Sequence, residues 1–237
     1  MCWSASASVA MVAVGGAAAA VTFARGDPRG IWLTLGYFTV IEGLQAVGYA
    51  VVDECGSNAN WTVTLLSYLH IVLQPLFINA FAMAIAPAEV PAATRRWVWA
   101  LAGLVSAFML LRLVPLEAFG QCRPGDTLCG AALCLVAGEW HIGWEVPLND
   151  LPRVLLGTDV QFPGYLFAVF VLPLLYGAWR FVVFNAIFGP LLAYSLTSDM
   201  NEMPAIWCLF SVWLILISLS PFIRHRVMDA RVLDARA

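Results

Sequence analysis

Long apolar stretches recur along this chain of 237 residues, and they constrain its fold more than any other feature. A helix that crosses a bilayer needs about 20 consecutive, mostly apolar residues. The composition supports this interpretation, because 62% of the residues are hydrophobic and only 11% are charged. A water-soluble domain has about 25% charged residues. The chain is therefore expected to be an integral membrane protein.

Seven stretches are long and apolar enough to be membrane spans. They cover residues 6–23, 31–52, 61–85, 97–116, 162–179, 181–196 and 204–223. The expected fold is therefore an all-α bundle of seven transmembrane helices, which forms one domain over residues 1–223. Residues 118–161 form its one long connection, and residues 224–237 form a short basic tail.

The distribution of arginines predicts the orientation of these spans. The chain has 12 basic residues, and all of them are arginine. One side of the predicted bundle receives Arg25, Arg29, Arg95, Arg96, Arg180, Arg224, Arg226, Arg231 and Arg236. The other side receives only Arg123 and Arg153. Because basic residues concentrate on the cytoplasmic side, we expect the N-terminus outside and the C-terminal tail inside, near anionic lipid.

Residues 131–148 are apolar enough to suggest an eighth span, but charged groups argue against it. Glu139, His141 and Glu145 would be costly in hydrocarbon, and an extra span would also place Arg180 outside. We expect an outer-surface or re-entrant segment. If it is helical, His141 and Glu145 share one face at a spacing that suits two metal ligands. The alternative is an interfacial anchor formed by its tryptophans.

Four cysteines fall on the outer side, which is oxidising in most cells. A disulfide between Cys122 and Cys129 would close a small turn. A disulfide from Cys55 to one of the loop cysteines would instead tie two loops together. The spacing alone does not decide between these pairings.

Glu42 and His70 stand out among the ionisable residues of the predicted spans, where such groups usually mark a functional site. Counting from the outer ends of their spans places both roughly 14–15 Å deep, because a helix rises 1.5 Å per residue. Their spans are consecutive, so the two side chains are expected to face each other. Gln45 and Gln74 follow at three- and four-residue spacing and extend the two polar stripes. Arg112 of the fourth span would be the counter-charge of Glu42 or would extend to the outer headgroups.

These five residues predict an outward-facing polar pocket for a small molecule or ion, with proton coupling through Glu42 and His70. This pocket would suit a transporter or a sensor. A simpler interpretation is that the polar groups only form hydrogen bonds between helices. A third is a metal-dependent membrane enzyme, hydrolase-like, in which Glu42, His70, His141 and Glu145 hold a divalent metal ion. A fourth is an accessory subunit whose aromatic faces pack on a membrane partner.

Several cofactors and partners are excluded or disfavoured. The chain has no lysine for a retinal or pyridoxal phosphate Schiff base. Its predicted spans contain a single histidine, which argues against a haem b with two axial histidines. A net charge of −3 offers no basic surface for nucleic acid. Sequence motifs of the common hydrolases and nucleotide-binding proteins are absent. Membrane lipids are the one partner that the composition itself implies.

Three short motifs carry a resemblance to a known family. They are SYLHIVLQP at residues 67–75, GEWHI at 138–142 and FPGY at 162–165. These runs resemble a bacterial multi-pass membrane protein family of unknown function, and the likeness extends over nearly the whole chain. The resemblance implies a location in the bacterial inner membrane and brings no activity with it.

Overall fold

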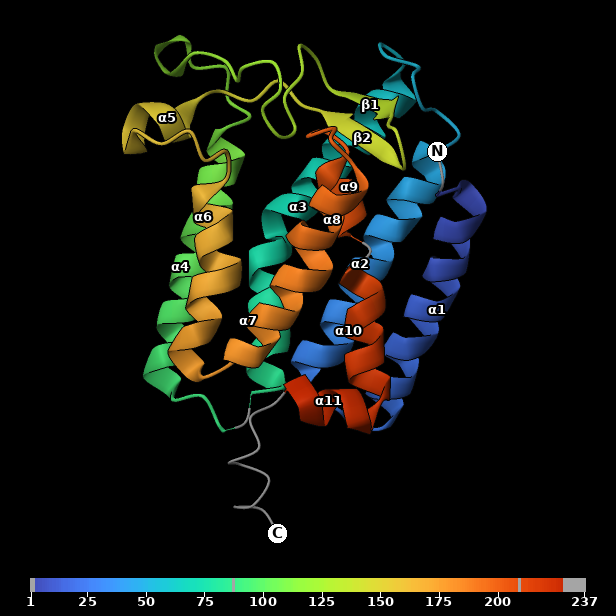
Figure 1. Cartoon of the computed structure of the whole chain (residues 1–237), viewed down its shortest axis with the longest axis vertical. Helices are drawn as coiled ribbons and strands as arrows, with labels where there is room; N and C mark the ends of the chain where they lie inside the picture. Colours follow the sequence, from blue (N-terminus) through green and yellow to red (C-terminus); the bar gives the residue numbers. More distant parts are fainter. Residues whose placement is uncertain (1–2, 87, 209, 228–237) are drawn as a thin grey trace.

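Antiparallel helices make up most of the computed structural model, which describes residues 3–86, 88–208 and 210–227 (Figure 1). The first four are continuous: α1 (Ala5–Ala24), α2 (Arg29–Gly48), α3 (Asn58–Ala84) and α4 (Ala92–Leu111). Ser4 and Ser57 cap α1 and α3, each accepting a hydrogen bond from a backbone N–H of the first turn. The chain thus passes up and down between two ends of the molecule.

The later helices are broken into short pieces that still stack end to end. One rod consists of α6 (Pro163–Leu166), η2 (Phe167–Val171) and η3 (Leu172–Tyr176). The next consists of α7 (Trp179–Ala186), η4 (Ile187–Leu191) and α8 (Leu192–Leu196). The last contains α9 (Met203–Trp207) and α10 (Phe210–Leu219), and α11 (Pro221–Val227) follows it. Pro173 and Pro190 lie in two of these irregular turns, because proline cannot donate the regular helical hydrogen bond.

Length and hydropathy make four of the described helical segments candidates for membrane spans. These are Ala5–Ala24, Arg29–Gly48, Asn58–Ala84 and Trp179–Leu196, and two shorter apolar segments cover Pro163–Tyr176 and Met203–Leu219. The helix α4 has 20 residues, but Arg95 and Arg96 near its start lower its mean hydropathy. The predicted tail, 224–237, is described only to Val227, so Arg231 and Arg236 lie outside the described residues.

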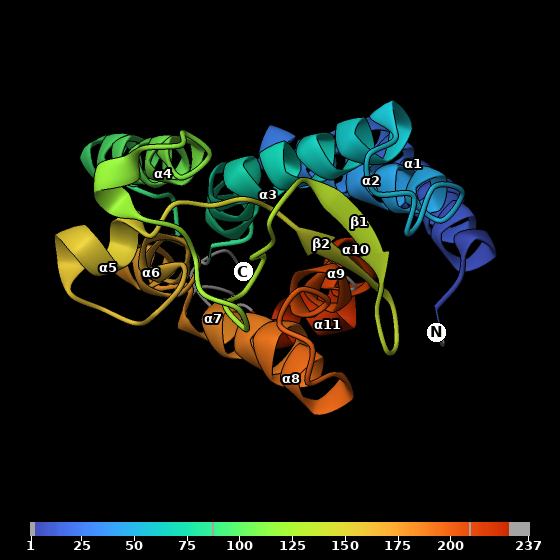
Figure 2. The same ribbon diagram turned by 90° about the horizontal axis from the view of Figure 1, so that it is seen from above.

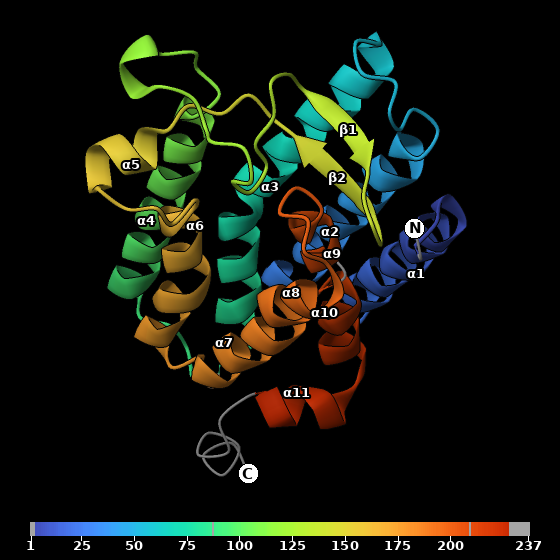
Figure 3. The ribbon, with the colours of Figure 1, turned by 45° about the horizontal axis from the view of Figure 1, so that its top comes forward.

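A cap of loops and a β-hairpin covers one end of the bundle (Figure 3). The hairpin pairs β1 (Cys134–Ala137) with β2 (Ile142–Glu145) in antiparallel register, with Leu135 opposite Trp144. A short 3-10 helix η1 (Glu117–Phe119) and the helix α5 (Leu151–Leu156) complete the cap. The expectation of an all-α fold is therefore wrong in this segment. A helix over 138–145 is also wrong, because these residues form the hairpin turn and its second strand.

Two disulfides hold the cap. Cys55, in the α2–α3 loop, is bonded to Cys134 of β1, and Cys122 is bonded to Cys129 within one turn. The two pairings that the sequence left open therefore occur together. Asn60 reinforces the first link, because its side-chain amide donates to the carbonyl oxygens of Val51 and Leu135 at 2.8 and 2.9 Å. The hairpin is thus fastened to the ends of α2 and α3.

The helices α2 and α3 pack closely at the end opposite the cap. A Cβ atom added to Gly30 would lie 2.3 Å from the carbonyl oxygen of Ala80. Since the obstacle is backbone, it cannot rotate away, and an added methyl group would separate the two helices.

We therefore expect Gly30→Ala to lower the free energy of unfolding by about 1 to 2 kcal/mol, because overpacking shifts the backbone. The matched control is Gly36→Ala in the same helix, where a Cβ would meet nothing within 4 Å. Thermal unfolding of both variants in the same detergent measures the difference. Equal melting temperatures would show that the α2–α3 contact is looser than described.

Candidate functional site

A cavity of about 350 Å³ lies between the helical rods and reaches the cap. Ile71, Gln74 and Ile78 line one side, and their spacing places them on one stripe of α3. That stripe spans about 10 Å along the helix axis. The rod of residues 163–176, η4 and α9 supply one part of the remaining wall, and loop residues 127–128 and 159–162 supply another. Seen from above, these elements surround the same part of the bundle (Figure 2). Most of the lining side chains are apolar.

Trp207 of α9 lines this cavity because a neighbouring helix leaves room for its ring. A Cβ atom added to Gly189 would lie 2.4 Å from the indole nitrogen of Trp207. The residue after this glycine, Pro190, lines the cavity, and Phe170 stacks on Trp207 with ring centroids 5.9 Å apart. The Gly-Pro sequence therefore shapes the wall, by admitting a large ring and by interrupting the regular helix.

A pair of neutral polar groups lies deep in this cavity. The Tyr165 hydroxyl donates to the Gln74 side-chain oxygen at 2.6 Å. The Gln74 amide nitrogen directs one hydrogen toward the Cys208 sulfur at 3.9 Å, which is a weak contact. Both Gln74 and Tyr165 are buried. An amide nitrogen carries two hydrogens, so Gln74 retains a donor for an oxygen atom of a bound molecule.

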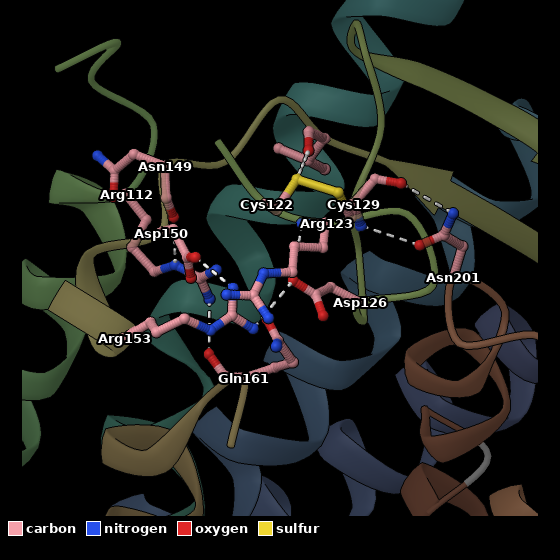
Figure 4. Close-up of a disulfide and its surroundings, with 11 residues drawn as sticks. Arg112, Cys122, Arg123, Asp126, Cys129, Asn149, Asp150, Arg153, Gln161 and Asn201 are labelled. Carbon is pink, nitrogen blue, oxygen red and sulfur yellow. Dashed lines mark hydrogen bonds and ion pairs between the residues drawn. A yellow bond between two sulfur atoms is a disulfide. The ribbon is translucent and has the colours of Figure 1, made fainter. Parts of the chain in front are cut away.

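Arg112 holds the loop at the mouth of the cavity (Figure 4). Its Nη1 donates to the Gln161 carbonyl oxygen at 2.7 Å, and its Nε donates to the Asn149 carbonyl oxygen at 3.3 Å. The guanidinium group also lies 4.5 Å from the centre of the Phe162 ring. Gln161 and Phe162 both line the cavity. Arg112 therefore positions the mouth, and it neither pairs with Glu42 nor reaches out to headgroups, since it is 1% exposed.

A network around Arg153 joins the loops beside the mouth. Its guanidinium group contacts the carboxylates of Asp150 and Asp126, and it donates to Asp159 at 2.8 Å. Asp159 lines the mouth, and its side chain is 86% exposed. The Asn201 side-chain oxygen accepts from the Cys129 backbone N–H at 2.9 Å, and its side-chain nitrogen donates to the Cys129 carbonyl oxygen at 3.1 Å. The disulfide turn is therefore also fixed to the α8–α9 loop. The cavity thus opens at the cap.

Glu202 anchors the hairpin turn, a role that its sequence context does not indicate. Its fully buried carboxylate accepts hydrogen bonds from the backbone N–H groups of Glu139, Trp140 and His141. It also accepts a hydrogen bond from the Thr197 hydroxyl at 2.6 Å. A carboxylate surrounded by converging backbone donors is a strong, charge-assisted arrangement. Glu202 therefore joins the hairpin to the start of α9.

His141 fits into an aromatic enclosure under the hairpin. Its ring stacks between Trp3 and Tyr49, with centroids 5.7 Å from each. Its Nδ1 accepts from the Ile142 backbone N–H at 2.7 Å and lies 3.0 Å from the Tyr49 hydroxyl. With Nδ1 accepting, the proton of the neutral ring is on Nε2. Burial lowers the pKa of His141 from 6.5 to about 3. His141 is thus a neutral structural group at ordinary pH.

The structure places Glu42 and His70 with different partners. His70 stacks on Tyr37, with ring centroids 3.9 Å apart, and its Nε2 lies 2.8 Å from the Tyr37 carbonyl oxygen. Glu42 accepts a hydrogen bond from the Ser211 hydroxyl at 3.2 Å. Gln45 is fully buried on α2, and within the described ranges neither the oxygen nor the nitrogen of its side-chain amide has a hydrogen-bond partner. Of the five predicted pocket residues, only Gln74 lines the large cavity.

The depth of these residues explains why the predicted pair does not form. His70 is level with Tyr37, which precedes Glu42 by five residues, or about 7.5 Å of helix. The predicted spans ended and began at residues 52 and 61, whereas α2 ends at Gly48 and α3 begins at Asn58. In an antiparallel pair these two shifts add, because both move His70 deeper relative to Glu42.

The proposed metal ligands are also not brought together. His141 precedes β2 and Glu145 ends it, so the two residues are four positions apart, which is about 13 Å of extended chain. His141 contacts Tyr49 in the cap, and His70 contacts Tyr37 within the bundle. Among the described residues, no group of three or more histidine, cysteine, aspartate or glutamate side chains is placed to hold a metal ion. The geometry therefore gives no support to the metal-dependent enzyme.

Comparison with known proteins identifies a family but no activity. Neither a curated protein nor a solved structure shows significant similarity to this chain. A family model does match, and it covers residues 6–228, from the first helix to just past the last described residue. That match includes the cap, the cavity and Glu42, so all of these features belong to the family domain. The chain belongs to a protein family of unknown function, DUF5765.

Proposed function

We propose that this protein spans a membrane seven times, with the cap outside, and binds an amphipathic small molecule in the large cavity. The apolar surface of the helices supports the proposal that the protein spans a membrane. Large apolar side chains such as Val14, Leu104, Leu175 and Ile187 are exposed around the bundle, where a lipid environment would cover them. Arg25 follows α1, and the first turns of α2 and α4 carry Arg29, Arg95 and Arg96. These segments, together with α11, lie at the end opposite the cap (Figure 1). That distribution follows the preference of arginine for the cytoplasmic side.

The large cavity is the feature that supports the proposed binding of an amphipathic molecule. Its volume of about 350 Å³ lies within the range of about 300 to 1,000 Å³ that is typical of small-molecule sites. Such sites combine apolar walls with a few placed polar groups. Here the walls are apolar, and the Gln74–Tyr165 pair supplies the polar groups.

The charge of the lining favours an amphipathic ligand over an ion. Asp159 is the one charged side chain among the lining residues, and it lies at the exposed mouth. An ion deeper in the cavity would be desolvated with no opposite charge beside it, which is unfavourable. An apolar chain would instead cover Ile71, Ile78 and Trp207, while a carbonyl or hydroxyl oxygen accepts the free Gln74 amide hydrogen.

Photolabelling tests this proposal with a defined probe, a fatty acid that carries a diazirine in its chain. The protein is labelled in lipid nanodiscs and digested, and the modified peptides are identified by mass spectrometry. We expect labels on cavity residues such as Ile71 and Met203. Labels are also expected on lipid-facing residues such as Leu175, which serve as an internal reference.

A cavity-filling variant gives the control. Ile78→Trp places a large ring in the cavity, so its labels at Ile71 and Met203 should fall to background while labelling at Leu175 persists. Leu73→Trp adds the same ring on an exposed face of α3 and should leave cavity labelling unchanged. Labels confined to lipid-facing residues in the wild-type protein would contradict the proposed function.

A further inference from the structure

A second, much smaller cavity lies beside Glu42, between α1, α2 and α10. It is lined by Gly15 of α1, by Phe38, Thr39 and Glu42 of α2, and by Ser211 of α10. Its volume of about 10 Å³ is about the space of one water molecule. The helix α1 approaches α2 closely beside it, since a Cβ atom on Gly15 would lie 2.4 Å from the Thr39 hydroxyl oxygen.

The Glu42 carboxyl group has one unused oxygen here. Oε1 accepts from the Ser211 hydroxyl, whereas Oε2 is buried and has no hydrogen-bond partner among the described residues. The residue as a whole is 1% exposed. A charged carboxylate at such a position requires a neutralising partner, because an isolated buried charge is very unfavourable.

In the part of the chain that the structure describes, no residue on the surrounding helices supplies that partner. The segments Ala5–Ala24 and Phe210–Leu219 contain no ionisable side chain, and Arg29 is 13 residues from Glu42 along α2. The other titratable groups in and next to the neighbouring helices are Tyr37 on α2, Tyr49 just after α2, Tyr68 and His70 on α3, and Cys208 before α10. Of these, only His70 carries a positive charge when protonated, and its ring is stacked on Tyr37 at a different level.

We infer that Glu42 is a proton-binding site, which is protonated in the resting protein and exchanges its proton with the large cavity past Phe38. A protonated carboxyl group is neutral, and its O–H donates to a water molecule in the small cavity. The Thr39 hydroxyl donates to the Leu35 carbonyl at 2.8 Å and can accept a hydrogen bond from that water.

Two observations place the exchange route between the cavities. Phe38 lines both of them, so one side chain separates the Glu42 site from the cavity that opens at the cap. Ser211 and Cys208 lie one helical turn apart, with the Ser211 backbone N–H donating to the Cys208 carbonyl at 2.9 Å. Cys208 lines the large cavity, and Ser211 contacts Glu42. This site does not require that the large cavity bind an amphipathic molecule, so the two proposals stand or fall separately.

Infrared spectroscopy of the protein in lipid bilayers tests the inference, because a protonated carboxyl group has a carbonyl band distinct from that of a carboxylate. At neutral pH we expect such a band in the wild-type protein and its loss in Glu42→Gln. Glu139→Gln, which alters an exposed glutamate, should retain the band. Ser211→Ala should shift the band, because it removes the hydrogen bond to Oε1; this shift still tests the assignment if Glu42→Gln fails to fold.

The exchange route has its own measurement. Phe38→Ala should speed deuterium exchange of the band about tenfold or more, because it removes the barrier whose opening limits exchange. Phe23→Ala, which alters an exposed side chain of α1, should leave the exchange rate of the band unchanged. The proton site would be overturned if the band persists in Glu42→Gln. It would also be overturned if sodium or potassium chloride, added at constant pH, abolishes the band in the wild-type protein. Equal exchange in Phe38→Ala and the wild-type protein would overturn the route.

Discussion

Replacing Glu202 by glutamine is expected to lower the free energy of unfolding by about 3 kcal/mol. The carboxylate accepts from three successive backbone N–H groups of the hairpin turn and from the Thr197 hydroxyl. A glutamine of the same shape presents an NH₂ group to some of these donors, and at least one buried N–H then loses its acceptor. Hydrogen bonds to a charged group are worth about 1.5 to 3 kcal/mol each.

Thermal unfolding in detergent measures the effect. For a chain of this size, about 3 kcal/mol corresponds to a fall of about 6 to 12 °C in the melting temperature. The matched control is Glu139→Gln in the same turn, whose exposed carboxylate lies 3.3 Å from the Ser198 hydroxyl. That change should stay within about 0.5 kcal/mol. If both variants melt together, Glu202 does not anchor the hairpin.

Acidification is expected to destabilise the cap through His141. Burial lowers its pKa in the folded protein from 6.5 to about 3, so between these values the unfolded chain binds more protons than the folded one. Stability then rises with pH. The contribution of His141 is fully present above the ordinary pKa and is lost as the pH falls toward the folded-state value. Since each pKa unit is worth 1.36 kcal/mol, the loss is about 2 kcal/mol near pH 5 and about 3 kcal/mol near pH 4.

The comparison with His141→Gln isolates this contribution from that of the carboxyl groups. Melting temperatures of the two proteins are measured at several pH values over the same range. The wild-type protein should lose stability more steeply on acidification, whatever the absolute stability of the variant. If the melting temperatures of the two proteins fall in parallel with pH, folding does not lower the pKa of His141. The enclosure by Trp3 and Tyr49 would then not be tight.

The sequence allowed the helices to be predicted well, because apolar length is a local property that needs no knowledge of neighbours. Each of the seven predicted stretches coincides with a helical rod, including those interrupted by Pro173 and Pro190. The ends were less accurate. Errors of three and four residues at the α2–α3 loop were enough to pair Glu42 with His70, when the structure pairs His70 with Tyr37.

Features that depend on distant segments were not predictable. The hairpin strands have only four residues each, and their turn is held by Glu202, about 60 residues later in the chain. The cavity wall likewise draws on residues from Phe38 to Cys208. One part of the cavity wall has a signal in the sequence, because Gly189 and Pro190 together indicate a close helix contact and an interrupted helix. Nothing in the sequence indicated that Trp207 would be the side chain packed there.

The most direct test of the binding proposal is an experimental density map of the protein in lipid nanodiscs. The account predicts elongated density in the large cavity, running along the Ile71–Ile78 stripe and ending within hydrogen-bond distance of the Gln74 amide. It also predicts that this density disappears in Ile78→Trp. A wild-type cavity that contains only discrete water peaks, or that side chains close, would contradict it.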